Sequence, residues 1–124
     1  MMKGGRMMTV SQNYLPDIRK LALAGNVTYK LHCFQRMNER GIDRSDVLHI
    51  LKSETNEVVE IQAPTTKSPN ERVLIFDPKY SKKIIIVLTP LLVNGPDLRI
   101  ITVEFVDNSI WRSSSKAPPS IQRI

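Results

Sequence analysis

The chain has 124 residues, with 18 Lys and Arg against 12 Asp and Glu, and so a formal net charge of +6 at pH 7. This length suits one domain, and the 41% hydrophobic content excludes a wholly disordered chain. The longest apolar run is interrupted by Thr89 and Pro90 and falls short of the roughly 20 apolar residues that cross a bilayer. A single cysteine, Cys33, excludes an internal disulfide. We therefore expect a cytoplasmic protein without a membrane segment.

The positive charge is concentrated in the first half of the chain. Up to Ser53 there are nine Lys and Arg and four Asp and Glu, so 9 − 4 = +5. From Glu54 onward nine face eight, so 9 − 8 = +1. Such an uneven distribution favours an anionic partner for the first half, such as nucleic acid, phosphate groups or an acidic protein.

Composition divides the chain into three segments. Residues 1–13 show no helix or strand periodicity and are predicted to be a flexible leader, in which Met7 or Met8 is an alternative start. Residues 14–112 form the predicted single domain. Residues 113–124 are rich in Ser and Pro and are predicted to be a disordered tail.

Three helices are predicted in the first half. A short first helix ends at Gly25, and a second runs from about residue 28 to residue 40 and ends at Gly41, which is well suited to a left-handed cap. The third begins after Asp43 as its N-cap residue, with Asp46 three residues on in place of the usual Glu of a capping box.

Strands follow the helices. Short β-branched or aromatic runs separated by turn residues occur at 58–61, 73–76, 84–88 and 100–106. Helices followed by strands predict an α+β fold, in which the N-terminal helices pack on one face of a four-stranded, mainly antiparallel sheet.

The second helix carries the chemically distinctive residues. At about 100° per residue, His32, Arg36 and Arg40 fall within one arc of the helix together with Glu39, while Cys33, Phe34 and Met37 form an apolar stripe. Two arginines four residues apart repel each other unless an anion lies over them. The same arc is also typical of a solvated helix surface, and the spacing leaves both interpretations open.

A phosphodiester suits this arc chemically. Imidazole has an ordinary pKa near 6.5 and exchanges protons at neutral pH, and guanidinium donates two parallel hydrogen bonds to phosphate oxygens. Metal-independent RNA cleavage needs a base for the ribose 2′-hydroxyl, an acid for the leaving oxygen and cations at the phosphorus. His32, Arg36 and Arg40 supply part of that set.

The local sequence also resembles a known family. Residues 31–47 contain the pattern H-x-x-x-R-M-x-x-R-G-I followed by a capped helix, and Ile101 to Phe105 reads I-T-V-x-F. This resembles the DUF4258 family of small bacterial proteins, often described as toxins of toxin–antitoxin pairs. The resemblance implies a barnase- or RelE-like ribonuclease fold. Its motif positions correspond here to His32, Arg36, Arg40, Gly41 and Thr102.

The hypothesis is a metal-independent endoribonuclease of a toxin–antitoxin pair, with RNA and an acidic antitoxin as partners and no cofactor. The predicted catalytic residues are His32, Arg36 and Arg40. The predicted substrate-binding residues are Arg72, Lys83, Thr102 and Glu104. Each of these four also fits an ordinary polar strand face or strand end. The alternative is a non-catalytic RNA- or protein-binding module that uses the same basic face.

Overall fold

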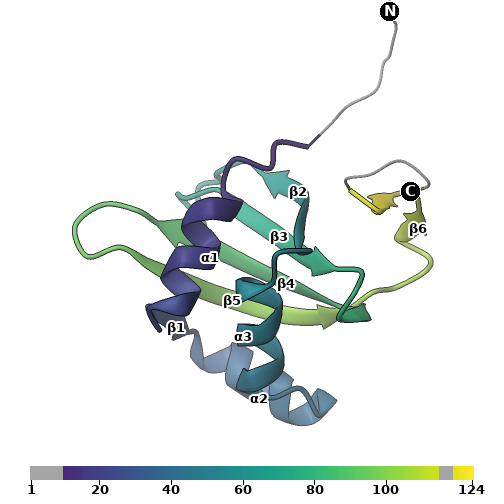
Figure 1. Cartoon of the computed structure of the whole chain (residues 1–124), viewed down its shortest axis with the longest axis horizontal. Coiled ribbons are helices and arrows are strands. Elements are labelled where there is room, and N and C mark those ends of the chain that lie inside the picture. The colour runs from purple at the N-terminus through teal and green to yellow at the C-terminus, as the bar shows by residue number, and fades with distance from the viewer. Residues whose placement is uncertain (1–9, 115–118) are drawn as a thin grey trace, which may run out of the picture.

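The computed structural model describes residues 10–114 and 119–124 of the chain (Figure 1). The elements are α1 (Leu15–Leu23), β1 (Val27–Tyr29), α2 (Leu31–Arg40), α3 (Arg44–Lys52), β2 (Glu57–Gln62), β3 (Arg72–Asp77), β4 (Ser81–Leu91), β5 (Asp97–Phe105), β6 (Trp111–Ser113) and β7 (Ile121–Arg123). The predicted α+β class is therefore confirmed.

The main sheet has five strands in the order β1-β5-β4-β3-β2, and β6 pairs with β7 in a separate two-stranded sheet. β1 runs parallel to β5, and the remaining pairs of the main sheet are antiparallel. The prediction of four strands is wrong because residues 27–29 form a strand where we expected the second helix to begin. Valine, threonine and tyrosine favour strands, and these three pair with Leu98, Arg99 and Ile100.

Capping signals set the ends of α2 and α3. Gly41 ends α2 in the left-handed region with φ +67°, and its N–H bonds to carbonyls of the preceding turn. At the start of α3, the Asp43 side chain accepts from the Asp46 N–H at 3.1 Å, and the Asp46 side chain accepts from the Asp43 N–H at 3.1 Å. Aspartate therefore completes a reciprocal capping box in place of glutamate.

We expect Gly41→Ala to lower the free energy of unfolding by about 1 kcal/mol. A Cβ at Gly41 would meet nothing within 4 Å, so the cost comes from the positive φ alone. Urea denaturation measures it, with the exposed Asn38→Ala on the same helix as the control. A Gly41→Ala midpoint equal to that of the wild type would contradict this account.

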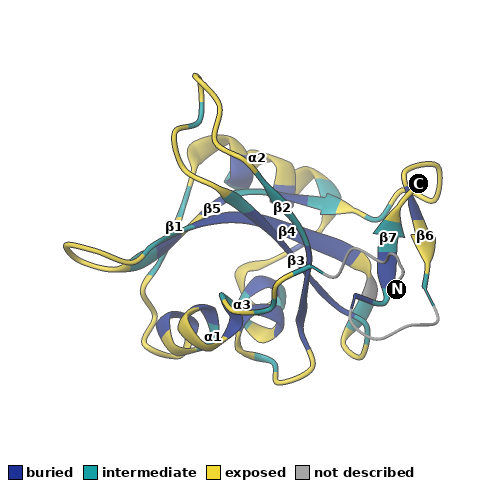
Figure 2. Ribbon diagram, turned by 90° about the horizontal axis from the view of Figure 1, so that it is seen from above, coloured by how far each residue is buried: buried dark blue, intermediate teal, exposed yellow. Residues whose placement is uncertain are grey.

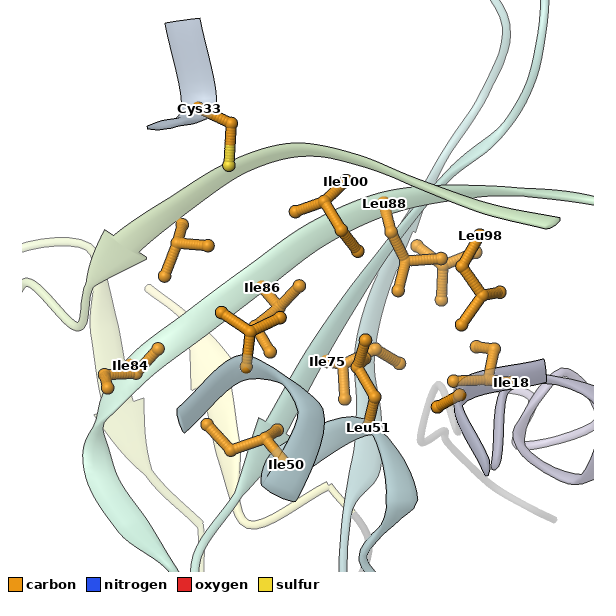
Figure 3. Packing of buried hydrophobic residues seen from close by; sticks show 14 of the residues in the cluster. Ile18, Cys33, Ile50, Leu51, Ile75, Ile84, Ile86, Leu88, Leu98 and Ile100 are labelled. Carbon is orange, nitrogen blue, oxygen red and sulfur yellow. The ribbon is translucent and has the colours of Figure 1, made fainter. Parts of the chain in front are cut away.

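Two apolar clusters lie on the two faces of the main sheet. On the first face, buried residues of all three helices pack against strand residues such as Ile75, Ile86 and Ile100, as Figure 3 shows for Ile18, Cys33 and Leu51. The second cluster comprises Val59, Leu74, Phe76, Ile85, Val87, Trp111 and Ile121. Alternation along β3 and β4 sends neighbouring residues to opposite clusters, so both faces of these strands are buried.

The β6–β7 hairpin covers one end of the second face (Figures 1 and 2). Trp111 is 3% exposed and Ile121 is 8% exposed. Arg123 on β7 binds Glu60 on β2 at 2.7 Å and lies over the Trp111 ring at 4.7 Å. Residues 119–124, which we expected to belong to a disordered tail, therefore include a strand, because burial and an ion pair fix it in place.

The predicted leader falls mostly on residues 1–9, which lie outside the described residues. Within residues 10–13, the Gln12 side chain reaches the edge strand β2. Its amide nitrogen donates to the Val58 carbonyl at 2.9 Å, and its oxygen accepts from the Val58 N–H at 2.8 Å. One glutamine amide thus occupies both backbone groups of one residue at the sheet edge.

Candidate nucleic-acid interface

α2 lies beside β5 and apart from α1 (Figure 2), and it meets the start of α3, where the Arg44 guanidinium lies 4.6 Å from the centroid of the Phe34 ring. The short strand β1 pairs only with the first part of β5, up to Ile100, and α2 follows along the remainder. Cys33 and Met37 are buried in the first cluster. Burial raises the pKa of the Cys33 thiol and keeps it protonated. Cys33 therefore serves packing, and the helix turns its polar face outward.

Arg40 fastens the end of α2 to the sheet. Its guanidinium donates from Nη1 to the Val103 carbonyl at 2.6 Å, and its side chain is partly buried. Because β1 does not extend to Val103, this carbonyl would otherwise be an unpaired edge acceptor. Arg40 thus has a structural partner in addition to its predicted role at a phosphate.

His32 and Arg36 are exposed and lie one helical turn apart. The nearest polar partner of His32 is the Gln35 side-chain oxygen, 3.4 Å from Nδ1. Among the described residues Arg36 forms neither a hydrogen bond nor an ion pair. Both side chains therefore remain available to a ligand that approaches α2 from solvent.

A basic cavity of about 220 Å³ lies at the N-terminal end of α2. Three cationic residues line it: Lys30 before α2, Lys67 in the β2–β3 loop and Arg99 on β5. Its other lining residues are Ser68, Pro69, Asn70, Thr89, Leu91 and Ile101. Sequence reasoning missed these three cations, because they come together only through strand pairing and the β2–β3 loop. The one signal in the sequence was the position of Arg99 between Leu98 and Ile100, which places its side chain on the opposite face of β5 from these two apolar residues.

A second cavity of about 400 Å³ lies at the C-terminal end of α2. It brings together Arg40 and Lys83, both predicted as site residues, with Asp46, Tyr80 and Phe105. The Tyr80 hydroxyl donates to Asp46 Oδ1 at 2.8 Å, and this hydrogen bond raises the pKa of Tyr80. The ring of His49 stacks on Tyr80 with centroids 3.9 Å apart. The second histidine of the chain thus packs against Tyr80.

The other predicted substrate-binding residues lie on the second face of the sheet. Register pairs Thr102 with Val87 and Glu104 with Ile85, whose side chains belong to the second cluster. Arg72 on β3 shares this face, and its Nε atom is buried without a hydrogen-bond partner among the described residues. These three residues thus come from the sheet, whereas His32 and Arg36 come from α2.

No group of three or more His, Cys, Asp and Glu side chains in the described ranges is arranged to hold a metal ion. Within these same ranges, no helix is both long enough and apolar enough to span a membrane.

Fold and site together define a small α+β protein with an exposed His–Arg helix face flanked by two polar cavities. The chain belongs to the family described as Domain of unknown function (DUF4258), whose model matches residues 29–105. This match runs from the last residue of β1 to the end of β5, so it contains α2, α3 and the antiparallel strands. No curated protein and no solved structure matches the chain.

Proposed function

We propose that the protein is an endoribonuclease that binds single-stranded RNA along α2 and cleaves it without a metal ion. The observation that carries this proposal is the exposed pair of His32 and Arg36, which project from one face of a helix that the sheet holds in place. His32 is near the start of this helix, and Arg36 follows one turn later.

The chemistry assigns a role to each side chain. His32 takes the proton from the ribose 2′-hydroxyl or delivers one to the departing 5′-oxygen, and Arg36 donates to the phosphate oxygens as negative charge develops. Attack by the 2′-oxygen breaks the phosphorus–oxygen bond to the next nucleotide. The products are a 2′,3′-cyclic phosphate and a 5′-hydroxyl.

The proposal extends to a barnase- or RelE-like ribonuclease relationship and to a role as the toxin of a toxin–antitoxin pair. Helices packed on a mainly antiparallel sheet support the first part, although fold alone assigns no activity. For the second part, an acidic antitoxin would neutralise the basic face of α2. A small regulator gene adjacent to the gene for this chain would support the pairing.

A non-catalytic RNA-binding module is the second candidate. It is favoured by the surroundings of His32, whose one hydrogen-bond partner among the described residues is the neutral side chain of Gln35. Cleavage through a 2′-oxygen calls for an acid and a base, and binding needs only the cations. In this case Arg36→Ala would weaken RNA binding in a salt-dependent way, and His32→Ala would leave the affinity nearly unchanged.

The test of cleavage compares two oligonucleotides of one sequence in the presence of EDTA. We expect the purified chain to cut the ribo-oligonucleotide to products that end in 2′,3′-cyclic phosphate. The all-2′-deoxy counterpart should stay intact, because it lacks the attacking hydroxyl. Intact RNA in EDTA, or equal cleavage of both strands, would overturn the proposal.

A further inference from the structure

The basic cavity at the N-terminal end of α2 collects positive charge from three separate parts of the chain. Lys30 precedes α2, Lys67 lies in the loop between β2 and β3, and Arg99 lies on β5. Like charges gathered around one hollow repel each other and favour an anion inside it. Hydroxyl and amide side chains from Ser68, Asn70 and Thr89 add hydrogen-bonding groups to the lining.

Nearby acidic groups neutralise this charge only in part. Asp97 lies 3.9 Å from the Arg99 guanidinium, at the outer limit of an ion pair, and it also accepts from the Thr28 hydroxyl at 3.0 Å. Among the described residues, Lys30 and Lys67 have no ion-pair partner. The cavity thus keeps an excess of positive charge.

The N-terminus of α2 and the side chain of Arg72 add to the preference of this cavity for an anion. Lys30, the N-cap residue of α2, makes no side-chain cap hydrogen bond, and the first turn of α2 holds no acidic residue. The partial positive charge of this helix end is therefore left without a counter-charge. Arg72 lies on the same sheet face, one strand beyond Thr89, with its buried Nε unpartnered within the described ranges. Both features favour an anion at this end of the molecule.

We propose that this cavity is a phosphate-binding subsite that holds a backbone phosphate of single-stranded nucleic acid. The assignment to RNA rests on the proposed function. Lys30 is two residues from His32, so the phosphate held here would belong to a nucleotide close to the bond that is cut. The cavity thereby fixes where along α2 the strand lies, and this positioning is separate from the chemistry of His32.

The test measures binding without cleavage, using a fluorescent all-2′-deoxy oligonucleotide at several salt concentrations. For single strands, log K falls with log salt at a slope of about 0.7 for each phosphate contact. We expect Arg99→Gln and Lys67→Gln each to weaken binding and to reduce this slope by about 0.7. Lys20→Gln, an exposed cation on α1, should keep the wild-type slope.

Two further binding measurements distinguish a nucleic-acid phosphate from free phosphate as the occupant of the cavity, and separate binding from cleavage. Inorganic phosphate should compete with the oligonucleotide for wild-type protein and less well for Arg99→Gln. His49→Ala, at an exposed histidine on α3 outside the cavity, should bind as tightly as the wild type. Because the deoxy strand cannot be cut, a failure of cleavage leaves this measurement intact. Wild-type slopes for both cavity variants would overturn the inference. Phosphate binding that depends on Arg99, combined with an unchanged oligonucleotide slope, would overturn the assignment to nucleic acid.

Discussion

His32→Ala is expected to slow RNA cleavage in EDTA by about 100-fold or more, the range that a positioned general acid or base contributes. The substitution removes the imidazole from an exposed position, and the Cys33 and Met37 contacts that hold α2 to the core remain. Folding should therefore be unaffected. The measurement is the single-turnover rate with saturating protein, which reports the chemical step apart from binding.

His49→Ala provides the matched control, because the chain has two histidines and both are exposed. His49 stacks on Tyr80 near the far end of α2, so its loss should leave the cleavage rate within a factor of two or so of wild type. Equal rates for wild type and His32→Ala would refute a catalytic role for His32.

Phe76→Ala is expected to lower the free energy of unfolding by about 3–5 kcal/mol, the usual cost of truncating a buried phenylalanine. Phe76 is 2% exposed and lies between the main sheet and the hairpin in the second cluster. The cavity left behind would face Trp111 and Ile121, so the β6–β7 hairpin should loosen first. Hydrogen exchange should speed up there before it does so in β4 and β5.

Phe105→Ala is the control for this prediction, because Phe105 is 48% exposed at the end of β5. We expect a smaller loss, about 1 kcal/mol or less, in the same urea titration. A similar loss for both variants would mean that burial in the second cluster does not set the stability. Uniform acceleration of exchange across the sheet would show that the hairpin and the main sheet unfold as one unit.

Local signals in the sequence predicted the parts of the fold that local chemistry determines. Gly41 and the Asp43–Asp46 box mark helix ends through their own backbone hydrogen bonds, and the four longer strands follow β-branched runs. β1 was missed because three residues become a strand only when β5 offers a parallel edge. β7 was missed because its Ser- and Pro-rich surroundings conceal Ile121, whose burial depends on Trp111.

In the candidate site, too, the sequence predicted what one element determines and missed what tertiary contacts determine. Helical periodicity predicted an exposed polar face containing His32 and Arg36, because both lie on one element. Periodicity gave no indication that Arg40 would bind the Val103 carbonyl, a contact that depends on where β1 stops. Lys30, Lys67 and Arg99 were missed for a similar reason, since they meet through tertiary structure alone.

The amide of Gln12 has a consequence for how copies of the chain behave toward one another. β2 is the last strand of the sheet, and an open strand edge invites pairing with the same edge of a second copy. At Val58 both backbone groups are already taken by a side chain of the same molecule. Two molecules could pair their β2 edges at Val58 only after the Gln12 side chain leaves its hydrogen bonds there. Gln12 therefore disfavours edge-to-edge association of two copies at this position.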